Sequence, residues 1–553
     1  MTTPIRESKT NGFEPLAQPL FRNLWISSTV SNLGGWMQDT AGTWLMTVLT
    51  PSPLLIALMQ TAASLPVVIL GLIAGATADI FDRRRLLIFW QAWMLAAVAL
   101  LSLLTFFGVI SPWVLLTLTF LLNIGAAMNN PAWQAIVPEV VPRAQLPDAV
   151  SLNSAGFNLA KAVGPALGGL AIAAFVHAAT GAAWVFLLNS LSFVGVIIVL
   201  YRWRRMPLFK SALPTERLFG SARSGLRYLR YAPALQAALA RTLFFTLFVS
   251  AIWALLAVVA KHDLHGALGG ALGYGILNGC MGGGAVIGAT NLPRVRRRFS
   301  ADAIISGATV VFVGTLLILA LVRIPWIIML ALIAGGFAWT SAMSTLNLAV
   351  QISVPAWVQA RALGIYQTVF GGGMALGSVI WGWVAEKSST PASLIAASAG
   401  LAVTLPLAWR FHILRGEQPD LSPYQYTRPA PELGEERDET AGPVRIAITY
   451  RIDPENYEAF IHALYRMRDV RLRDGAIRWG VYQDVSDPRK LTETFITESW
   501  LEYLRQRERF TASDREIREA IWNLHCESEP PQTSYMLYVK EATTSPSAER
   551  QRL

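Results

Sequence analysis

The sequence predicts an all-α membrane protein with twelve transmembrane helices in two six-helix bundles, followed by a small ferredoxin-like α+β domain. Of its 553 residues, 53% are hydrophobic and 15% are charged, a composition too apolar for an ordinary soluble protein. Apolar runs long enough to cross a bilayer recur up to residue 414. Beyond residue 443 the pattern changes to short alternating strands and amphipathic helices, which indicates a soluble domain.

The positions of the expected helices follow from bilayer thickness, because a helix needs about 20 mostly apolar residues to cross it. The expected spans are residues 22–49, 54–78, 86–107, 113–137, 149–174, 183–201, 234–260, 270–291, 302–322, 326–350, 363–385 and 391–413. The expected domains are a cytoplasmic N-terminal segment (1–21), the first bundle (22–201), a basic cytoplasmic linker (202–233), the second bundle (234–414), a Pro/Glu-rich linker (415–443), the soluble domain (444–540) and a tail (541–553).

Basic residues gather in the loops that fall on the same side as the N-terminus. They lie at 83–85, within 202–233 and at 294–298, whereas the opposite loops hold few: Lys261, Arg323 and Lys387. Because Lys and Arg concentrate in cytoplasmic loops, we expect a multi-pass protein of the bacterial inner membrane with both termini in the cytoplasm. This distribution also explains the net charge of +10, so no nucleic-acid partner is expected.

The two halves of the membrane part share short motifs. The same spacing joins Gly75, Asp79, Arg83 and Arg84 after the second span and Gly288, Leu292, Arg296 and Arg297 after the eighth. A second pair, Gln134 to Pro138 and Gln351 to Pro355, follows the fourth and tenth spans. Repeats in corresponding places of a six-plus-six array are typical of secondary transporters.

Three charged residues lie inside apolar spans: Asp39, Lys161 and Arg241. A charge in lipid is costly unless it faces a cavity or a partner, so we expect these residues, with Asn32 and Gln38, to serve in coupling or substrate binding. Asp39 is expected to exchange a proton. The alternative is a fixed pair with Lys161 or Arg241 that only holds helices together.

Lys161 is expected near the bilayer midplane, because it lies about 12 residues, or about 18 Å, into its helix. There it would attract an anionic or catechol-like substrate. Aromatic residues are expected to line a cavity for an aromatic or amphipathic cargo, although most of the tryptophans mark membrane interfaces. They are Trp36, Trp44, Trp133, Trp253, Trp339, Trp381 and Tyr366.

The loop after the second span is a candidate gate, formed by Gly75, Asp79, Arg83 and Arg84. Its arginines can pair with Asp79 or with a neighbouring helix in one conformation only. The alternative is that they only fix the topology of the chain.

The fifth span contains a candidate hinge. Its small residues, Gly164, Gly168 and Gly169, let a neighbouring helix approach closely, and Pro165 bends the helix. The alternative is close packing of small residues without movement.

These motifs resemble those of the major facilitator superfamily. The loop resembles G-x-L-A-D-R-x-G-R-R, with Ile80 and Asp82 at the positions that depart, and AKAVGPALGG (160–169) resembles the antiporter motif G-x-x-x-G-P-x-x-G-G. With FRNLWISSTVSNLGGWMQDTAGTWL, residues 15–413 are similar to the enterobactin-exporter branch. The resemblance implies alternating access and efflux of a small molecule such as a siderophore or a drug, and we expect Asp39 to couple this export to the proton gradient. Leu121 stands where many proton antiporters carry an arginine, so coupling through that arginine is not expected.

The C-terminal part predicts a β-α-β-β-α-β order with strands at 444–451, 476–484, 491–497 and 533–539. Trp479, GVYQDV, ETFITESW and LRQRERFT resemble the dimeric α+β-barrel domains of the antibiotic-biosynthesis monooxygenase group, which implies a homodimer. The alternative is a monooxygenase-like or ligand-sensing tail for which the membrane part is an anchor. His462 and His525, each on a predicted helix, do not suggest a metal or haem site. We therefore expect no enzyme activity, cofactor or metal, with a small molecule and the lipid bilayer as partners.

Overall fold

The structure is a computed structural model that describes residues 13–142, 145–203, 226–262, 264, 269–406, 420–422, 424 and 441–538. These residues form two compact units. The first unit holds the described residues up to 203, 237–351 and 363–406. The second holds 226–236, 352–362 and the described residues from 420 onward. Most of the expected linkers 202–233 and 415–443, and all of the expected tail 541–553, lie outside the described residues.

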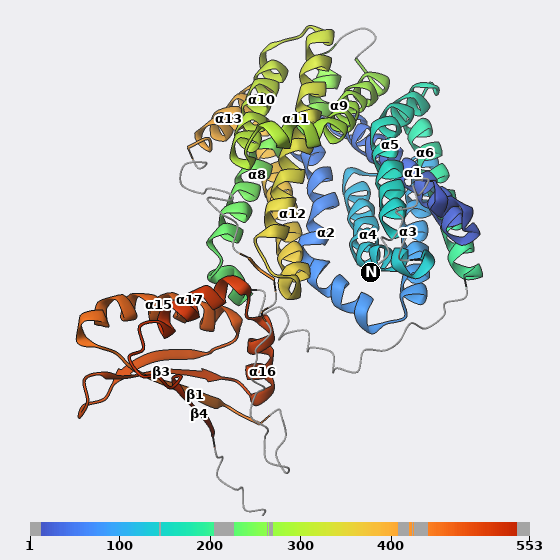
Figure 1. Cartoon of the computed structure of the whole chain (residues 1–553). Helices are drawn as coiled ribbons and strands as arrows, with labels where there is room; N and C mark the ends of the chain where they lie inside the picture. Colours follow the sequence, from blue (N-terminus) through green and yellow to red (C-terminus); the bar gives the residue numbers. More distant parts are fainter. Residues whose placement is uncertain are drawn as a thin grey trace, which may run out of the picture. The chain divides into compact units, whose positions relative to one another are not determined.

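Long helices form the membrane part in two halves (Figure 1). The first half contains α1 (Pro19–Leu49), α2 (Pro53–Ile80), α3 (Arg83–Phe106), α4 (Pro112–Val140), α5 (Leu146–Ala173) and α6 (Ala178–Arg202). The second half contains α8 (Pro233–His262), α9 (Ala271–Arg298), α10 (Ala301–Leu321), α11 (Pro325–Ile352), α12 (Ala356–Lys387) and α13 (Thr390–Val403).

Within the described residues, eight of these helices are long and apolar enough to cross a membrane. Helices α1, α5, α9 and α13 do not meet this requirement of length and hydropathy, for physical reasons. Charged Asp39 and Lys161 lie in α1 and α5, α9 is rich in glycine and ends in three arginines, and α13 has 14 residues. The count of twelve spans therefore stays a prediction.

Side-chain caps fix where several helices begin. Ser52 accepts a hydrogen bond from the backbone N–H of Leu55, and Asp82 accepts one from Arg85. Such oxygens satisfy N–H groups that have no partner inside the helix. The same cap opens α4, α10 and α13 at Ser111, Ser300 and Ser389.

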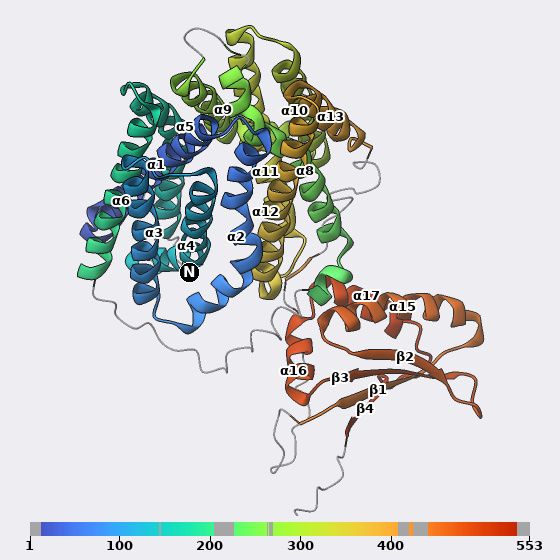
Figure 2. The ribbon, with the colours of Figure 1, turned by 180° about the vertical axis from the view of Figure 1, so that it is seen from behind.

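Helices from both halves pack against each other. Helix α5 packs against α9, and α2 lies beside α12 in both views (Figure 1; Figure 2). The Thr61 hydroxyl on α2 donates a hydrogen bond to the Ala375 carbonyl on α12 at 3.0 Å. Inside the first half, α1 packs against α5 and α6, so α1 lies next to the interface.

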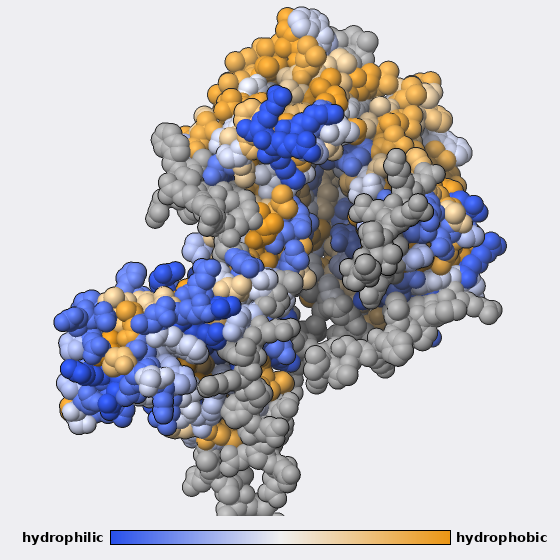
Figure 3. Space-filling view, in the orientation of Figure 1, coloured by the Kyte–Doolittle hydropathy of each residue, from blue (hydrophilic) through white to orange (hydrophobic). Residues whose placement is uncertain are grey.

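Apolar residues cover much of the outside of the helical unit (Figure 3). Large apolar side chains are exposed on several helices, among them Ile69, Phe89, Trp113, Leu188 and Trp383. Exposed apolar surface of this extent is stable in lipid and not in water. The described helices therefore belong to a multi-pass membrane protein.

The soluble domain contains β1 (Val444–Arg451), α15 (Tyr457–Asp474), β2 (Arg478–Gln483), β3 (Lys490–Thr497), α16 (Trp500–Arg509), α17 (Ala512–Trp522) and β4 (Gln532–Leu537). All strand pairs are antiparallel, and the strand order is β2-β3-β1-β4. Helices α15 and α17 cover one face of the sheet (Figure 2). Phe460, Leu464 and Met467 of α15 pack there against Tyr450 and Leu491.

The prediction that His525 lies on a helix is wrong. Helix α17 ends at Trp522, and His525 forms an isolated β-bridge with Ile452. Its Nδ1 accepts a hydrogen bond from the backbone N–H of Arg451 at 2.9 Å. This bond ties the residue to the end of β1, whereas His462 lies on α15 as predicted.

Candidate functional site

A central cavity lies between the two halves of the helical unit. It offers about 110 Å³ of space to the centres of water molecules, enough for several waters. Its lining comes from α1, α2, α3, α4, α5, α6, α8, α9 and α11. The polar lining residues are Gln38, Asp39, Thr40, Thr43, Gln60, Thr119, Lys161, Tyr274 and Asn278, and the aromatic ones are Trp36, Phe186, Trp253 and Trp339.

Asp39 brings a carboxylate to this cavity from the middle of α1. Its side chain is exposed to the cavity, and it has no ion-pair partner among the described residues. Thr43, one turn further along α1, lines the same cavity, as does Tyr274 from the other half. Asp39 therefore presents its charge to the cavity space.

Lys161 brings an ammonium group to the same cavity from α5. Its Nζ lies 5.7 Å from the centroid of the Trp36 ring on α1, a distance typical of a cation–π contact. The structure records no ion pair between Lys161 and Asp39, although both residues are described and line one cavity. The cavity thus holds two opposite charges that are not paired with each other.

Gln38 and Asn32 differ in their relation to the cavity. Gln38 is 4% exposed, lines the cavity and accepts a hydrogen bond from the side-chain amide of Asn189 on α6. Asn32 is half-buried on α1 about two turns before Asp39 and is not part of the lining. Gln38 is therefore oriented by the neighbouring helix, and Asn32 is not brought to the site.

Arg241 lies outside this cavity. It is 7% exposed near the start of α8 and forms an ion pair with Asp302 in the first turn of α10. The two helices belong to the same half, so this pair joins neighbouring helices. The structure records no ion pair between Arg241 and Asp39, both of which are described, so it does not contain the fixed Asp39–Arg241 pair of the alternative interpretation.

The glycines of α5 bring its backbone against two helices. A Cβ at Gly168 would lie 2.8 Å from the carbonyl oxygen of Met37 on α1, and one at Gly169 would lie 2.5 Å from that of Ala271 on α9. A Cβ at Gly164 would meet the Trp36 side chain at 2.6 Å. With Pro165, these glycines let α5 pack closely against both α1 and α9 of the second half.

The loop motif connects helices within the first half. The Arg83 Nη1 lies 2.8 Å from the Glu139 Oε1 at the end of α4, and the Arg84 Nε donates to the Leu200 carbonyl on α6 at 2.8 Å. Gly75 lies on α2, where an added Cβ would meet nothing within 4 Å. The side chain of Asp79 lies outside what the structure describes.

Polar contacts join the two halves at one end of the bundle. The Ser52 hydroxyl donates to the Glu386 Oε2 at 2.7 Å, and the backbone N–H of Leu54 donates to the same oxygen at 3.3 Å. At the same end, the Lys261 Nζ donates to the backbone carbonyl of Thr47. Glu386 thus lies at the N-terminus of α2 and Lys261 at the C-terminus of α1, where the helix dipoles favour these charges.

Several aromatic residues lie where the sequence predicts, and others do not. Trp253 and Trp339 line the cavity with ring centroids 4.5 Å apart, and Trp36 lies against Lys161. Trp133 and Trp381 are not among the lining residues. Sequence reasoning missed Tyr274 and Asn278, whose four-residue spacing on α9 places two polar groups on one helix face.

Comparison with known proteins identifies the family. A family model described as transmembrane secretion effector matches residues 10–544. YfiS, an uncharacterized MFS-type transporter of Bacillus subtilis, is 31% identical over 46% of this chain and 60% of its own length. The Staphylococcus aureus staphyloferrin A transporter is 29% identical over 28% of this chain and 39% of its own length. The multidrug efflux pump Tap of Mycolicibacterium fortuitum is 26% identical over 69% of this chain and 92% of its own length. The chain thus spans less than two thirds of the length of the first two relatives.

Solved structures share the fold of the helical unit. A variant of the nucleoside transporter NupG has a TM-score of 0.59 at 13% identity and covers 71% of this chain and 98% of its own. A bacterial homolog of the human lysosomal transporter Spinster, inward-facing and unoccupied, has a TM-score of 0.55 at 15% identity over 71% and 97%. The helical unit therefore has the fold of a membrane transporter. The chain belongs to the transmembrane secretion effector family of the major facilitator superfamily.

Proposed function

We propose that this chain is a secondary active transporter that exports a small amphipathic molecule, such as a siderophore or a drug, by alternating access. In this proposal twelve helices cross the bacterial inner membrane, and both termini are cytoplasmic. The observation that carries it is the cavity in which Asp39 and Lys161 present opposite charges that are not paired with each other. The names of two relatives, a staphyloferrin A transporter and a multidrug efflux pump, support such a cargo.

Alternating access is supported by the unequal ends of the bundle. At the end where α1 stops and α2 begins, Ser52 and Thr47 contact Glu386 and Lys261 of the other half. At the opposite end, the ion pairs described above join helices of one half, as Arg83 does with Glu139. The basic loops favour a cytoplasmic position for that opposite end. In this proposal the structure is the state closed to the outside.

Proton coupling through Asp39 is the second part of the proposal. A carboxylate that faces a hydrated cavity, without a fixed cation, can gain and lose a proton as the cavity changes sides. Position 121 holds a leucine, where many proton antiporters carry an arginine. Asp39 is the carboxylate in the cavity lining that can carry the proton instead. Lys161 binds the acidic group of the cargo, and Trp253 and Trp339 pack against its apolar part.

The soluble domain has a regulatory or dimerising role in this proposal, and it is not an enzyme. Its strand order, β2-β3-β1-β4, supports the ferredoxin-like fold and the likeness to the dimeric α+β barrels. Tyr482 and Met536, 62% and 49% exposed, lie on β2 and β4 and belong to the sheet face that α15 does not cover. A second copy that packs on this face would bury them.

The experiment is proton release by inside-out vesicles, driven by acidification and probed with a panel of siderophores and amphipathic drugs. We compare the native protein with Asp39→Asn and with Asp148→Asn, which changes a carboxylate on α5 outside the cavity. The proposal expects substrate-evoked proton release from the native protein and Asp148→Asn, and none from Asp39→Asn. Equal release from all three would remove Asp39 from coupling. No release with any compound would contradict export.

A further inference from the structure

The second compact unit combines the soluble domain with two short segments that lead into membrane helices. Residues 226–236 contain a short helix at 226–230 and the first residues of α8, and residues 352–362 contain the first residues of α12. Both α8 and α12 belong to the second half of the bundle. The soluble domain is therefore packed with segments of one half.

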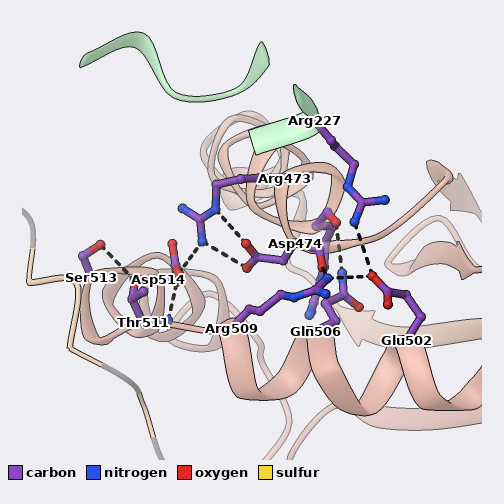
Figure 4. A network of polar contacts seen from close by, with 10 residues as sticks. Arg227, Arg473, Asp474, Glu502, Gln506, Arg509, Thr511, Ser513 and Asp514 are labelled. Atoms are coloured by element: carbon purple, nitrogen blue, oxygen red, sulfur yellow. Dashed lines mark hydrogen bonds and ion pairs between the residues drawn. The ribbon is translucent and has the colours of Figure 1, made fainter. Parts of the chain in front are cut away.

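An ion cluster forms the centre of this packing (Figure 4). The Glu502 Oε1 on α16 lies 3.3 Å from the Arg227 Nη2 of the 226–230 helix and 2.6 Å from the Arg509 Nη1. Arg509 also donates to the backbone carbonyl of Asp474 at 2.6 Å. One carboxylate of the domain thus binds a guanidinium from the segment before α8.

Aromatic rings extend the contact to the start of α12. The Arg509 guanidinium lies 4.7 Å from the centroid of the Trp357 ring, and Arg473 lies 5.6 Å from that of Tyr228. Tyr228 and Trp357 meet edge to face at 5.8 Å, and Tyr228 is 2% exposed. The two segments therefore touch each other and the soluble domain in one layer.

The domain holds its own side of this surface rigid. The Arg473 Nη2 lies 2.7 Å from the Asp514 Oδ2, and its Nε lies 2.8 Å from the Asp474 Oδ1. Thr511 is the N-cap of α17, and its side chain and backbone N–H both donate to Asp514 in a capping box. Arginines fixed in this way lose little freedom when the segments pack on them.

The geometry points to a clamp: the soluble domain, through Glu502 and Arg509, holds the segment before α8 and the start of α12 together and thereby slows the change between the two states of the transporter. This inference rests on the proposed transport function. The clamp is the contact of Arg227, Tyr228 and Trp357 with Arg473, Glu502 and Arg509.

The place of α12 explains why the clamp affects the cycle. Helix α12 packs closely on α2 of the other half, since a Cβ at Gly382 would lie 2.4 Å from the Ala57 Cβ. Glu386, near the end of α12, closes the end of the bundle with Ser52. A change of state must move α12 against α2, so tying its first turn to that of α8 stiffens the moving half.

The test uses the full chain in lipid nanodiscs and changes only residues outside the folded soluble domain. The clamp variants are Arg227→Gln, Trp357→Ala and their combination. The matched control is Arg230→Gln, an exposed arginine of the same short helix. Hydrogen exchange over α16 reports release of the clamp, and exchange over residues 52–56 reports opening of the closed end, with no cargo needed. Uptake of amphipathic dyes into inside-out vesicles reports transport.

We expect the double variant to raise exchange over α16 about tenfold, to raise exchange over residues 52–56, and to raise the initial transport rate about twofold or more. Arg230→Gln should match the native protein in all three. Unchanged exchange over α16 would show that the clamp does not form. Raised exchange over α16 with an unchanged or lower signal at residues 52–56 would show that it does not restrain the cycle. If no dye is transported by any form, the proposed export fails, and the exchange at residues 52–56 still decides the clamp.

Discussion

The Nζ of Lys161 lies 5.7 Å from the centroid of the Trp36 ring, so the ammonium group on α5 is held against α1 by an aromatic face. No ion pair of Lys161 is recorded among the described residues of the cavity. A cationic group that is partly shielded from bulk water attracts an anionic group of a ligand more strongly than it would in water. In the proposed function, this contact positions Lys161 for an acidic cargo.

Lys161→Gln should weaken binding of an anionic cargo about tenfold, which corresponds to about 1.4 kcal/mol. Trp36→Leu keeps the charge and removes the cation–π contact, so a smaller loss of about threefold is expected. Calorimetric titration of the purified protein with carboxylate siderophores measures both. Lys387→Gln, at the exposed end of α12, is the control. Equal affinities in Lys161→Gln and the control would exclude Lys161 from the binding site.

Glu386→Gln should open the closed end of the bundle more often. The change removes the charge that accepts hydrogen bonds from Ser52 and from the N-terminus of α2. Such a bond at an exposed position stabilises by about 1 kcal/mol, so opening should rise about fivefold. A cysteine introduced at Thr43 in the cavity, labelled by a membrane-impermeant maleimide from the outside, measures it. A labelling rate equal to that of Lys387→Gln would argue against this contact as a gate.

Gly275→Ala should disturb the contact between α9 and α5. A Cβ at Gly275 would lie 2.6 Å from the carbonyl oxygen of Pro165 and 3.0 Å from the Cα of Gly169, both backbone atoms. Overpacking of this kind costs about 1 to 3 kcal/mol. Gly283→Ala, on the same helix with nothing within 4 Å, should be neutral or slightly stabilising. Thermal unfolding in detergent compares the two, and equal midpoints would contradict the close approach.

The sequence predicts the parts of the site that follow from the cost of placing a charge in an apolar helix. Asp39 and Lys161 are charges in long apolar runs, which are tolerated only at a cavity or a partner, and both line the cavity. The same rule does not say whether a given charge faces a cavity or pairs with another residue. Arg241 is explained by a partner, Asp302, which lies 61 positions away in the sequence and belongs to another helix.

Other features escape sequence reasoning because they depend on tertiary contact. Tyr274 and Asn278 are ordinary polar residues of a glycine-rich helix, and only the packing of α9 against α5 brings them to the cavity. In the sequence, Arg227 is one of several arginines in a basic loop. Its pairing with Glu502 joins residues 275 positions apart, which the local sequence does not predict. The strands of the soluble domain were predictable because alternation within a strand is local.

Asp302→Asn should destabilise the second half without affecting cargo binding. Removing one partner of a buried ion pair leaves the other charge unpaired, and because Asp302 keeps 26% exposure the expected cost is about 2 kcal/mol. Replacing both residues, as Arg241→Met with Asp302→Leu, removes both charges and should cost less than the sum of the single changes. Thermal unfolding of the single and double variants measures this double-mutant cycle. A changed cargo affinity with unchanged stability would return Arg241 to the candidate site residues.

Asp474 should make the stability of the soluble domain depend on pH. Burial raises the pKa of its carboxyl from 3.8 to about 6, an effect that Arg473 partly opposes. Because the folded-state pKa lies above the unfolded value, the folded domain binds the proton more tightly between about pH 4 and pH 6. This contribution to stability is therefore complete below about pH 4, falls as pH rises to about 6, and is gone above that; its size is about 3 kcal/mol.

Asp474→Asn should remove this contribution to the pH dependence of stability. The other carboxylates of the domain should then account for the pH dependence that remains. Hydrogen exchange over α15 in the full chain at pH 5 and pH 7, corrected for the intrinsic rates, measures the local stability. Asp469→Asn, an exposed carboxylate on the same helix that is 49% accessible, is the control and should behave like the native protein. If Asp474→Asn and the control lost stability equally between the two pH values, the buried carboxyl would not be the group that titrates.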